Sequence, residues 1–223
     1  MPIFKKKNED FFKKWSPEMA YILGFFTADG SMIKNKRGAH FIEFQITDRD
    51  LLIKIREALG SNHKITARKR NKRWKTSYRL QVGSKEIFRD LIKLGITPNK
   101  SKSIGLPQVK PHYFSHFARG YFDGDGNVPI SKYVSAETTA KKYTTILSGF
   151  VSGSKKFLKK LHIELKKLSN INGGILYFHD KGYRLSFSVK DSLALYHFLY
   201  KDTKNDLFLL RKRKKFEKYF KIR

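Results

Sequence analysis

The sequence of 223 residues contains no cysteine. Disulfide bonds, thiolate metal sites and a cysteine nucleophile are therefore excluded, and any metal site must use oxygen or nitrogen ligands. Acidic residues are also scarce, with 19 Asp and Glu against 48 Lys and Arg, which gives a formal net charge of +29 at pH 7. So strong a positive field opposes compaction unless a polyanion neutralises it, and nucleic acid is the first candidate partner.

Long apolar runs are missing as well. The sequence has no stretch typical of a membrane span, no lipidation signal, and a basic N-terminus without the apolar segment of a signal peptide. These absences predict a protein that is not secreted and does not act at a membrane, located in the cytoplasm or, if organelle-encoded, in the organellar matrix. The 40% hydrophobic content, with 19 Phe, is ample for a packed core.

One short pattern occurs twice, as ILGFFTADG at residues 22–30 and as ARGYFDGDG at residues 118–126. Each copy has a glycine, two large apolar residues and a final Asp-Gly. Asp29 and Asp125 stand 96 residues apart, close to half the chain. Repetition at this distance predicts two related halves, each with one copy of the same landmark.

The surrounding residues predict a helix at each copy. SPE at residues 16–18 is a helix start, with Ser as N-cap and Pro in the first turn, so a helix is predicted over residues 17–29. Gly30 is expected to end it in the left-handed conformation. Pro111 and Gly126 are expected to bound the second helix in the same way. Further helices are predicted at residues 50–59, 85–94, 154–168 and 191–200.

Alternating segments between these helices predict strands with one polar face. In HFIEFQIT, residues 40–47, apolar and polar side chains alternate. Tyr-Arg-Leu recurs at residues 78–80 and 183–185, 105 residues apart, so the second half is expected to hold about nine extra residues, within 129–145. The predicted order of elements in each half is helix, two strands, helix, two strands, helix.

The polar strand faces are rich in side chains that read base edges or hold phosphates. An ordinary solvated sheet face is the alternative. The residues predicted to contact DNA are Lys34, Arg37, Glu43, Gln45, Lys64, Thr66, Arg68, Arg70, Ser77, Arg79, Gln81, Ser148, Tyr177, His179, Arg184, Ser186 and Ser188.

The two copies resemble the LAGLIDADG motif, and the order of helices and strands resembles that family's αββαββα unit. The resemblance covers nearly the whole chain and is to the intron-encoded or free-standing, single-chain homing endonucleases with two motifs. It implies an α+β fold made of a tandem pseudo-two-fold repeat, with subdomains at residues 1–107 and 108–223. The motif helices would pack at the centre, and two curved antiparallel sheets would form a DNA-binding saddle. Thr27 departs from the family pattern, in which an acid is common.

Small residues stand four apart in each motif, namely Gly24 and Ala28 in the first and Gly120 and Gly124 in the second. Each helix would thus carry a bare stripe that allows close backbone approach. Contact along the stripes would bring the two motif acids together. Carboxylates at helix C-termini repel each other and oppose the helix dipoles, and a divalent cation relieves both effects. Oxygen ligands favour Mg²⁺.

The resemblance implies a role for particular residues at this metal site. Asp29 and Asp125 would be catalytic metal ligands, with Gly30 and Gly126 beside them. Two or three Mg²⁺ ions are expected per active complex, with Mn²⁺ able to substitute and Ca²⁺ binding without supporting cleavage.

Further catalytic groups follow from the same resemblance. A polar residue after the second strand is usual in the family; Asp48 matches it in the first half, whereas Gly153 stands at the matching place in the second. A basic residue near the end of each unit is also usual. Lys100 and Lys212 are the candidates for stabilising transition-state charge, with Lys102 and Lys214 as alternatives.

Other readings of the motifs are weaker. DGDGN at residues 123–127 begins like a calcium-binding EF-hand loop, but Val128 replaces the required Gly and Val134 the required Glu. The seven His have no metal-ligand spacing. The basic tail, residues 211–223, is predicted to be a final helix that docks its aromatic residues on the core and turns its cations to phosphates.

The predicted function is a monomeric, site-specific endonuclease that hydrolyses double-stranded DNA at a long, largely asymmetric target with divalent metal. Two alternatives share the fold: a group I intron RNA maturase, with or without cleavage, and a catalytically inactive DNA-binding regulator. The presence of both motif acids argues against the regulator.

Overall fold

The computed structural model describes residues 5–69, 71, 73–98, 103–134, 142–201, 203 and 207–222. The helices are α1 (Pro17–Asp29), α2 (Arg49–Ala58), α3 (Lys85–Lys93), α4 (Phe114–Asp125), α5 (Lys155–Leu168), α6 (Val189–Tyr200) and α7 (Leu210–Ile222). The strands are β1 (Ser31–Lys34), β2 (His40–Ile46), β3 (Ile65–Arg68), β4 (Ser77–Gly83), β5 (Gly126–Asn127), β6 (Ile130–Val134), β7 (Lys142–Ile146), β8 (Ser148–Ser152), β9 (Ile175–His179) and β10 (Gly182–Phe187). Within these residues, none of the helices has the length and apolar character that crossing a bilayer requires.

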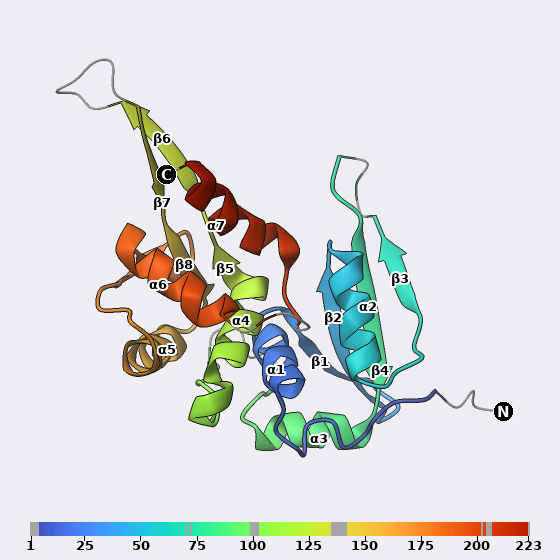
Figure 1. Ribbon diagram of the computed structural model, residues 1–223. Coiled ribbons are helices and arrows are strands. Elements are labelled where there is room, and N and C mark those ends of the chain that lie inside the picture. Colours follow the sequence, from blue (N-terminus) through green and yellow to red (C-terminus); the bar gives the residue numbers. More distant parts are fainter. Residues whose placement is uncertain are drawn as a thin grey trace.

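The strands form two equivalent antiparallel sheets. Their orders are β1-β2-β4-β3 and β5-β8-β10-β9, and β6 and β7 form a separate hairpin. The central helices α1 and α4 lie between the two sheets (Figure 1). The predicted α+β fold with two antiparallel sheets is therefore confirmed.

Local sequence signals set the start of each motif helix. Ser16 caps α1, because its hydroxyl accepts a hydrogen bond of 3.1 Å from the Met19 N–H. Pro111 opens a short 3₁₀ turn, Pro111–Tyr113, and α4 begins only at Phe114. The second motif helix is thus one turn shorter than predicted.

The helices α1 and α4 pack with their backbones in contact. A Cβ added to Gly24 would collide with the carbonyl oxygen of Phe117, and one added to Gly120 would collide with that of Tyr21. Glycine is the residue that permits so close an approach. Both helices lie inside the core, with residues 19–27 of α1 buried throughout.

The glycines that end the motif helices are not left-handed. Gly30 has φ −79° and Gly126 has φ −87°, which are extended conformations, so the left-handed prediction was wrong. The chain passes directly from each helix into a strand, β1 or β5, and extended backbone keeps φ negative. Glycine serves packing instead, because a Cβ would strike the ring of Phe26 in the first half and of Phe122 in the second.

Each sheet buries its apolar face. In β2 the side chains of Ile42, Phe44 and Ile46 are buried while their neighbours are not, which confirms the alternation predicted there. In the second sheet Phe150 of β8 and Leu185 of β10 are fully buried. The apolar face of each sheet packs against the core, so the polar face of the strands lies on the opposite, outer side of the sheet.

The second half has an additional hairpin, which has no counterpart among the described residues of the first half. The strands β6 and β7 pair from Ile130 and Ile146 to Val134 and Lys142. The hairpin projects away from the rest of the molecule, and α7 lies against β7 (Figure 1). The extra residues predicted between 129 and 145 fall in this hairpin.

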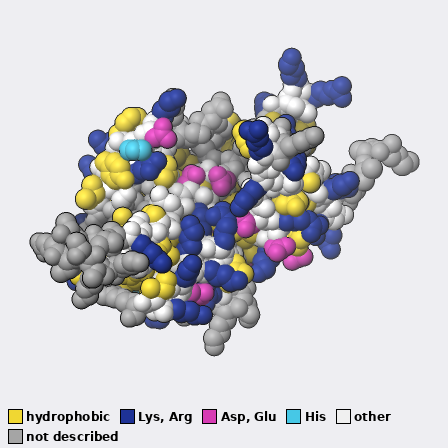
Figure 2. Space-filling model, turned by 90° about the horizontal axis from the view of Figure 1, so that it is seen from above, with side chains coloured by type: hydrophobic (Ala, Val, Ile, Leu, Met, Phe, Trp, Pro, Cys, Tyr) yellow, Lys and Arg dark blue, Asp and Glu magenta, His cyan; other side chains and the backbone are white. Residues whose placement is uncertain are grey.

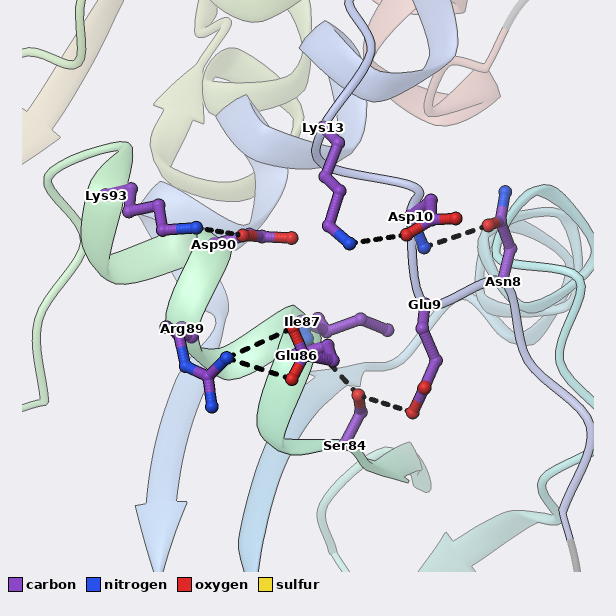
Figure 3. Close-up of polar contacts among 10 residues, drawn as sticks. All are labelled: Asn8, Glu9, Asp10, Lys13, Ser84, Glu86, Ile87, Arg89, Asp90 and Lys93. Atoms are coloured by element: carbon purple, nitrogen blue, oxygen red, sulfur yellow. Dashed lines mark hydrogen bonds and ion pairs between the residues drawn. The ribbon is translucent and has the colours of Figure 1, made fainter.

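The N-terminal segment is fastened to the first half by polar contacts. Ser84 caps α3 by accepting a 3.2 Å hydrogen bond from the Ile87 N–H and donates one of 3.0 Å to Glu9 (Figure 3). The Asn8 N–H donates to the carbonyl of Leu59 at the end of α2, at 2.8 Å. The N-terminal segment thus connects the end of α2 to the start of α3 by hydrogen bonds.

Replacing Gly24 or Gly120 by Ala is expected to lower the free energy of unfolding by about 1–3 kcal/mol, the usual cost of overpacking. The new Cβ must displace a carbonyl of the facing helix. Gly105→Ala is the control, because nothing lies within 4 Å of its added Cβ. Urea denaturation compares the three variants, and a midpoint of Gly24→Ala equal to that of the control would contradict the backbone contact.

Candidate active site and nucleic-acid interface

The two motif acids lie at the same end of the central helix pair. Asp29 is the last residue of α1 and Asp125 the last of α4. The Oδ2 atom of Asp29 is 3.3 Å from the place that a Cβ on Gly124 would occupy. Both carboxylates also act electrostatically on the Tyr121 hydroxyl and the Lys212 ammonium. Asp29 is exposed and Asp125 half-buried, so both are open to a ligand.

Lys212 brings a positive charge to these helix ends. Its Nζ donates to the carbonyl oxygens of Phe122, Asp123 and Gly124, at 2.6, 2.8 and 3.1 Å. These carbonyls belong to the last turn of α4, where the negative end of the helix dipole lies. The Phe122 carbonyl also accepts the Gly126 N–H. Burial lowers the pKa of Lys212 to about 8, against the pull of nearby carboxylates. The ammonium thus stays mainly protonated at pH 7.

The alternative basic residues differ from Lys212 in position or lie outside the described residues. Lys214 is exposed and lies along the cavity beside Asp48, whereas Lys212 is 5% exposed and contacts the helix end. Lys100 and Lys102 lie outside the described residues.

A buried carboxylate, which sequence reasoning missed, organises the second half of the site. Asp123 is 1% exposed. Its Oδ2 accepts hydrogen bonds of 2.7 Å from the Tyr21 hydroxyl of α1 and of 2.7 Å from the Leu209 N–H just before α7. Burial raises the pKa of Asp123 to about 6, although Tyr21 and Lys212 favour its ionised form. One side chain therefore joins α1, α4 and the start of α7.

Arg119, one turn earlier on α4, holds the same segment. Its guanidinium is 2% exposed and donates to the carbonyls of Leu207 and Leu199, at 2.9 Å each, and to Nδ1 of His116 at 3.0 Å. Together, Arg119 and Asp123 bind the end of α6 and the residues directly before α7, and so position Lys212.

The first motif has no such pair. Leu23 and Thr27 stand where the second motif has Arg119 and Asp123, and the Thr27 hydroxyl donates to Leu23 within its own helix, at 2.7 Å. The buried pair could have been predicted from the sequence, because Arg119 and Asp123 are charged residues inside an otherwise apolar motif.

Asp48 is engaged with the other half of the molecule. It accepts a 3.0 Å hydrogen bond from Nε of Arg211 in α7 and a 3.3 Å bond from the Thr47 hydroxyl. It lines a cavity of about 770 Å³ between the start of α2 and the start of α7, where Lys54 and Phe208 also lie. The contacts of Asp48 therefore link the two halves.

The predicted reading residues of β2 and β4 form one connected polar face. Nε of Arg79 donates to Glu43 at 2.6 Å, and the Gln81 amide donates to the same carboxylate oxygen at 3.4 Å. The Gln45 amide donates to the Ser77 hydroxyl at 3.2 Å. These side chains are half-buried, so the face is ordered before any partner binds.

The other predicted contacts in the first half are exposed on or near β1 and β3. They are Lys34, Arg37, Lys64, Thr66 and Arg68. Arg70 lies outside the described residues.

In the second half, five of the predicted contacts reach the surface. Tyr177 and His179 are exposed on β9, and the Tyr177 hydroxyl is 3.2 Å from that of Ser186. Arg184 and Ser186 are half-buried on β10, and Ser188 is exposed at the start of α6.

Ser148 does not reach the surface, so its predicted DNA contact was wrong. It is 1% exposed, stands opposite Phe187, and donates a 2.9 Å hydrogen bond to Ser192 of α6. The strand β7 ends at Ile146 and β8 begins at Ser148. The even-numbered residues of β8 lie on its buried face.

Basic side chains cover the face above the central helices. Figure 2 looks down on the side toward which α7 and the β6–β7 hairpin extend in Figure 1. Lys and Arg gather over the middle of this face, with few Asp and Glu among them. A polyanion is the natural counterpart of such a surface.

The ends of α1 and α4 provide a small set of oxygen atoms that could act as metal ligands. In the part of the chain that the structure describes, no three His, Cys, Asp or Glu side chains cluster as metal ligands. Two carboxylates and neighbouring backbone carbonyls are what the protein supplies. This set fits Mg²⁺, which keeps several waters and takes phosphate oxygens as further ligands.

Comparison with known proteins supports the resemblance seen in the sequence. Residues 16–94 match the sequence family described as the LAGLIDADG-like domain. The first half of the chain thus contains a LAGLIDADG-like domain. It is also 31% identical over 193 residues to the uncharacterized protein MJ0398 of Methanocaldococcus jannaschii, covering 80% of this chain and 64% of that protein. The chain thus spans somewhat less than two thirds of that relative's length.

Solved structures of LAGLIDADG proteins share the fold at low sequence identity. The meganuclease I-AabMI bound to uncleaved DNA is similar with a TM-score of 0.64 and 12% identity, covering 93% of this chain and 90% of that chain. The homing endonuclease I-LtrWI bound to target DNA has a TM-score of 0.61 and 15% identity, covering 96% and 90%. Both halves of the chain therefore take part in the common fold.

Asp123→Ala is expected to lower the free energy of unfolding by about 3–5 kcal/mol, the cost of leaving buried partners of a carboxylate uncompensated. The Tyr21 hydroxyl and the Leu209 N–H lose their acceptor. Thr27→Val, at the matching position of α1, is the control and should cost less than about 1 kcal/mol, because that hydroxyl bonds only within its helix. Chemical denaturation measures both, and equal losses would argue against the network.

Proposed function

We propose that this protein is a site-specific homing endonuclease of the LAGLIDADG family that hydrolyses both strands of double-stranded DNA with a divalent metal. One observation carries the proposal: Asp29 and Asp125 end two helices whose backbones touch, in a fold shared with DNA-bound meganucleases. We further propose that it acts as a cytoplasmic monomer, with residues 1–107 and 108–223 as its two subdomains.

In this proposal the two acids bind Mg²⁺, with the backbone of Gly30 and Gly126 beside them. When bound, the metal activates a water and stabilises the leaving oxygen of each strand. Mn²⁺ should replace Mg²⁺ in cleavage, and Ca²⁺ should permit binding alone. Lys212 keeps a positive charge at the end of α4, where it can stabilise the developing negative charge on the phosphate.

The outer faces of the two sheets would lie in the major groove and contact bases. A net charge of +29 supplies the attraction to phosphates. The target should be long and largely asymmetric, because the faces differ: Glu43 and Gln45 on β2 correspond to Gly149 and Val151 on β8. Asp48, through Arg211, would hold α7 against the first half during binding.

The second candidate is an RNA maturase that uses the same basic face. The polar sheet faces and the cationic surface would suit RNA as well as DNA, whereas two acids at touching helix ends, one exposed and one half-buried, favour hydrolysis. Selection from a random DNA library with Mg²⁺, and with Ca²⁺ for binding alone, separates the functions. Recovery of cleaved duplexes of one sequence supports the endonuclease; tight binding of group I intron RNA with no DNA selected would replace it.

Asp29→Asn and Asp125→Asn are each expected to abolish double-strand cleavage and to leave DNA affinity within about threefold of wild type, since a carboxylate is lost only from the metal site. Asp180→Asn, in the exposed β9–β10 turn, is the control and should cut normally. Gel assays of supercoiled plasmid carrying the selected site measure nicked and linear products. Normal linear product from either motif variant would disprove the proposed mechanism.

Binding is expected to weaken steeply with salt. If about six to ten phosphates are contacted, affinity should fall roughly 10³- to 10⁵-fold between about 50 and 200 mM salt. Fluorescence anisotropy with Ca²⁺ gives the slope of log affinity against log salt. A flat response would rule out a phosphate-dominated interface.

A further inference from the structure

Arg79 and Arg184 occupy equivalent places in the two sheets. Each is the middle residue of a Tyr-Arg-Leu tripeptide on an inner strand, β4 or β10. The leucine that follows each arginine is fully buried, so both arginines face the outer side of their sheet. Their cross-strand neighbours are Gln45 and Thr66 for Arg79, and Val151 and Tyr177 for Arg184.

Arg79 already has a counter-ion. Its guanidinium forms an ion pair with Glu43 through both Nε, at 2.6 Å, and a terminal nitrogen. The Gln81 amide donates to the same carboxylate oxygen. The charge of Arg79 is thus neutralised within the protein, and two of its donor groups are occupied.

Arg184 lacks this partner. Gly149 stands where the first sheet has Glu43, because both lie opposite equivalent residues, Ser186 and Gln81. Val151, directly opposite Arg184, is apolar. Among the residues that the structure describes, Nε of Arg184 is buried and has no hydrogen-bond partner.

The buried Nε of Arg184 is unfavourable without an acceptor. Rotation of this half-buried side chain toward a ligand that supplies acceptors would remove that cost. The planar guanidinium matches a pair of acceptors on one edge, and in the major groove O6 and N7 of guanine form such a pair.

We propose that Arg184 reads a guanine in the half of the DNA target that lies under the second sheet, and that Arg79, held by Glu43, makes no comparable base contact at the equivalent position of the other half. The inference rests on the proposed DNA-binding function. It makes Arg184 a specificity-determining residue and explains chemically how a pseudo-symmetric pair of sheets selects an asymmetric target.

The test compares Arg184→Ala with Arg79→Ala, a matched pair at equivalent positions. Each full-length variant is used with Ca²⁺ to select bound duplexes from a library based on the wild-type site. Arg184→Ala is expected to lose guanine preference at one base pair by about tenfold or more, the usual size of a bidentate contact. Arg79→Ala should change preference at the mirror-related base pair by less than about threefold.

Two further variants separate reading from charge. Arg184→Lys keeps the positive charge but not the planar fork, so it should lose the guanine preference while keeping the salt slope of wild type. Glu43→Gln removes the counter-ion of Arg79 and should create a new guanine preference in the first half. Thermal unfolding of each variant confirms that the fold is intact.

A base analogue tests the contact directly. Replacing the guanine by 7-deazaguanine, which lacks N7, should weaken binding of wild type but not of Arg184→Ala. Uniform weakening of Arg184→Ala on all sequences, with a smaller salt slope, would identify a phosphate contact and overturn the inference. Equal losses of guanine preference in both alanine variants would overturn it too. Failure of the wild type to bind any duplex would instead refute the proposed function.

Discussion

The backbone contact between α1 and α4 is the constraint on which the rest of the structure depends. A side chain at Gly24 or Gly120 would collide with a carbonyl of the facing helix. Because the helices touch, their C-terminal ends coincide, and two acids that are far apart in the chain share one small region. Each helix leads directly into the first strand of its own sheet, so the same contact also sets the two sheets on either side of the centre (Figure 1).

The two carboxylates at these helix ends repel each other, and α7 brings a positive charge that reduces this repulsion. Lys212 donates to three carbonyls in the last turn of α4. Asp123 and Arg119 hold Leu209 and Leu207, just before α7, by buried hydrogen bonds. Burial makes such groups costly when unpaired, which favours a single position for the start of α7.

The two halves keep one frame and differ in the polar groups attached to it. The registers of β2 with β4 and of β8 with β10 correspond pair by pair. The ion pair of the first sheet is replaced in the second by a glycine and an arginine whose Nε has no partner among the described residues. In the motifs, the buried acid Asp123 on α4 stands at the position equivalent to Thr27 on α1. Backbone symmetry comes from the small residues and the core, whereas chemical asymmetry needs only a few polar positions.

The helix at residues 17–29, the alternation of β2, the extra residues between 129 and 145, and the proximity of the two motif acids could all be predicted from the amino-acid sequence. These are local or repeated signals: a cap, a period of two, a glycine stripe. The buried positions of Ser148 and Asp123 and the extended conformation of Gly30 could not be predicted in this way. Ser148 and Asp123 are buried by Ser192 of α6 and by the Leu209 N–H, and neither neighbour is close in sequence. Gly30 is extended because α1 passes directly into β1, which pairs with β2.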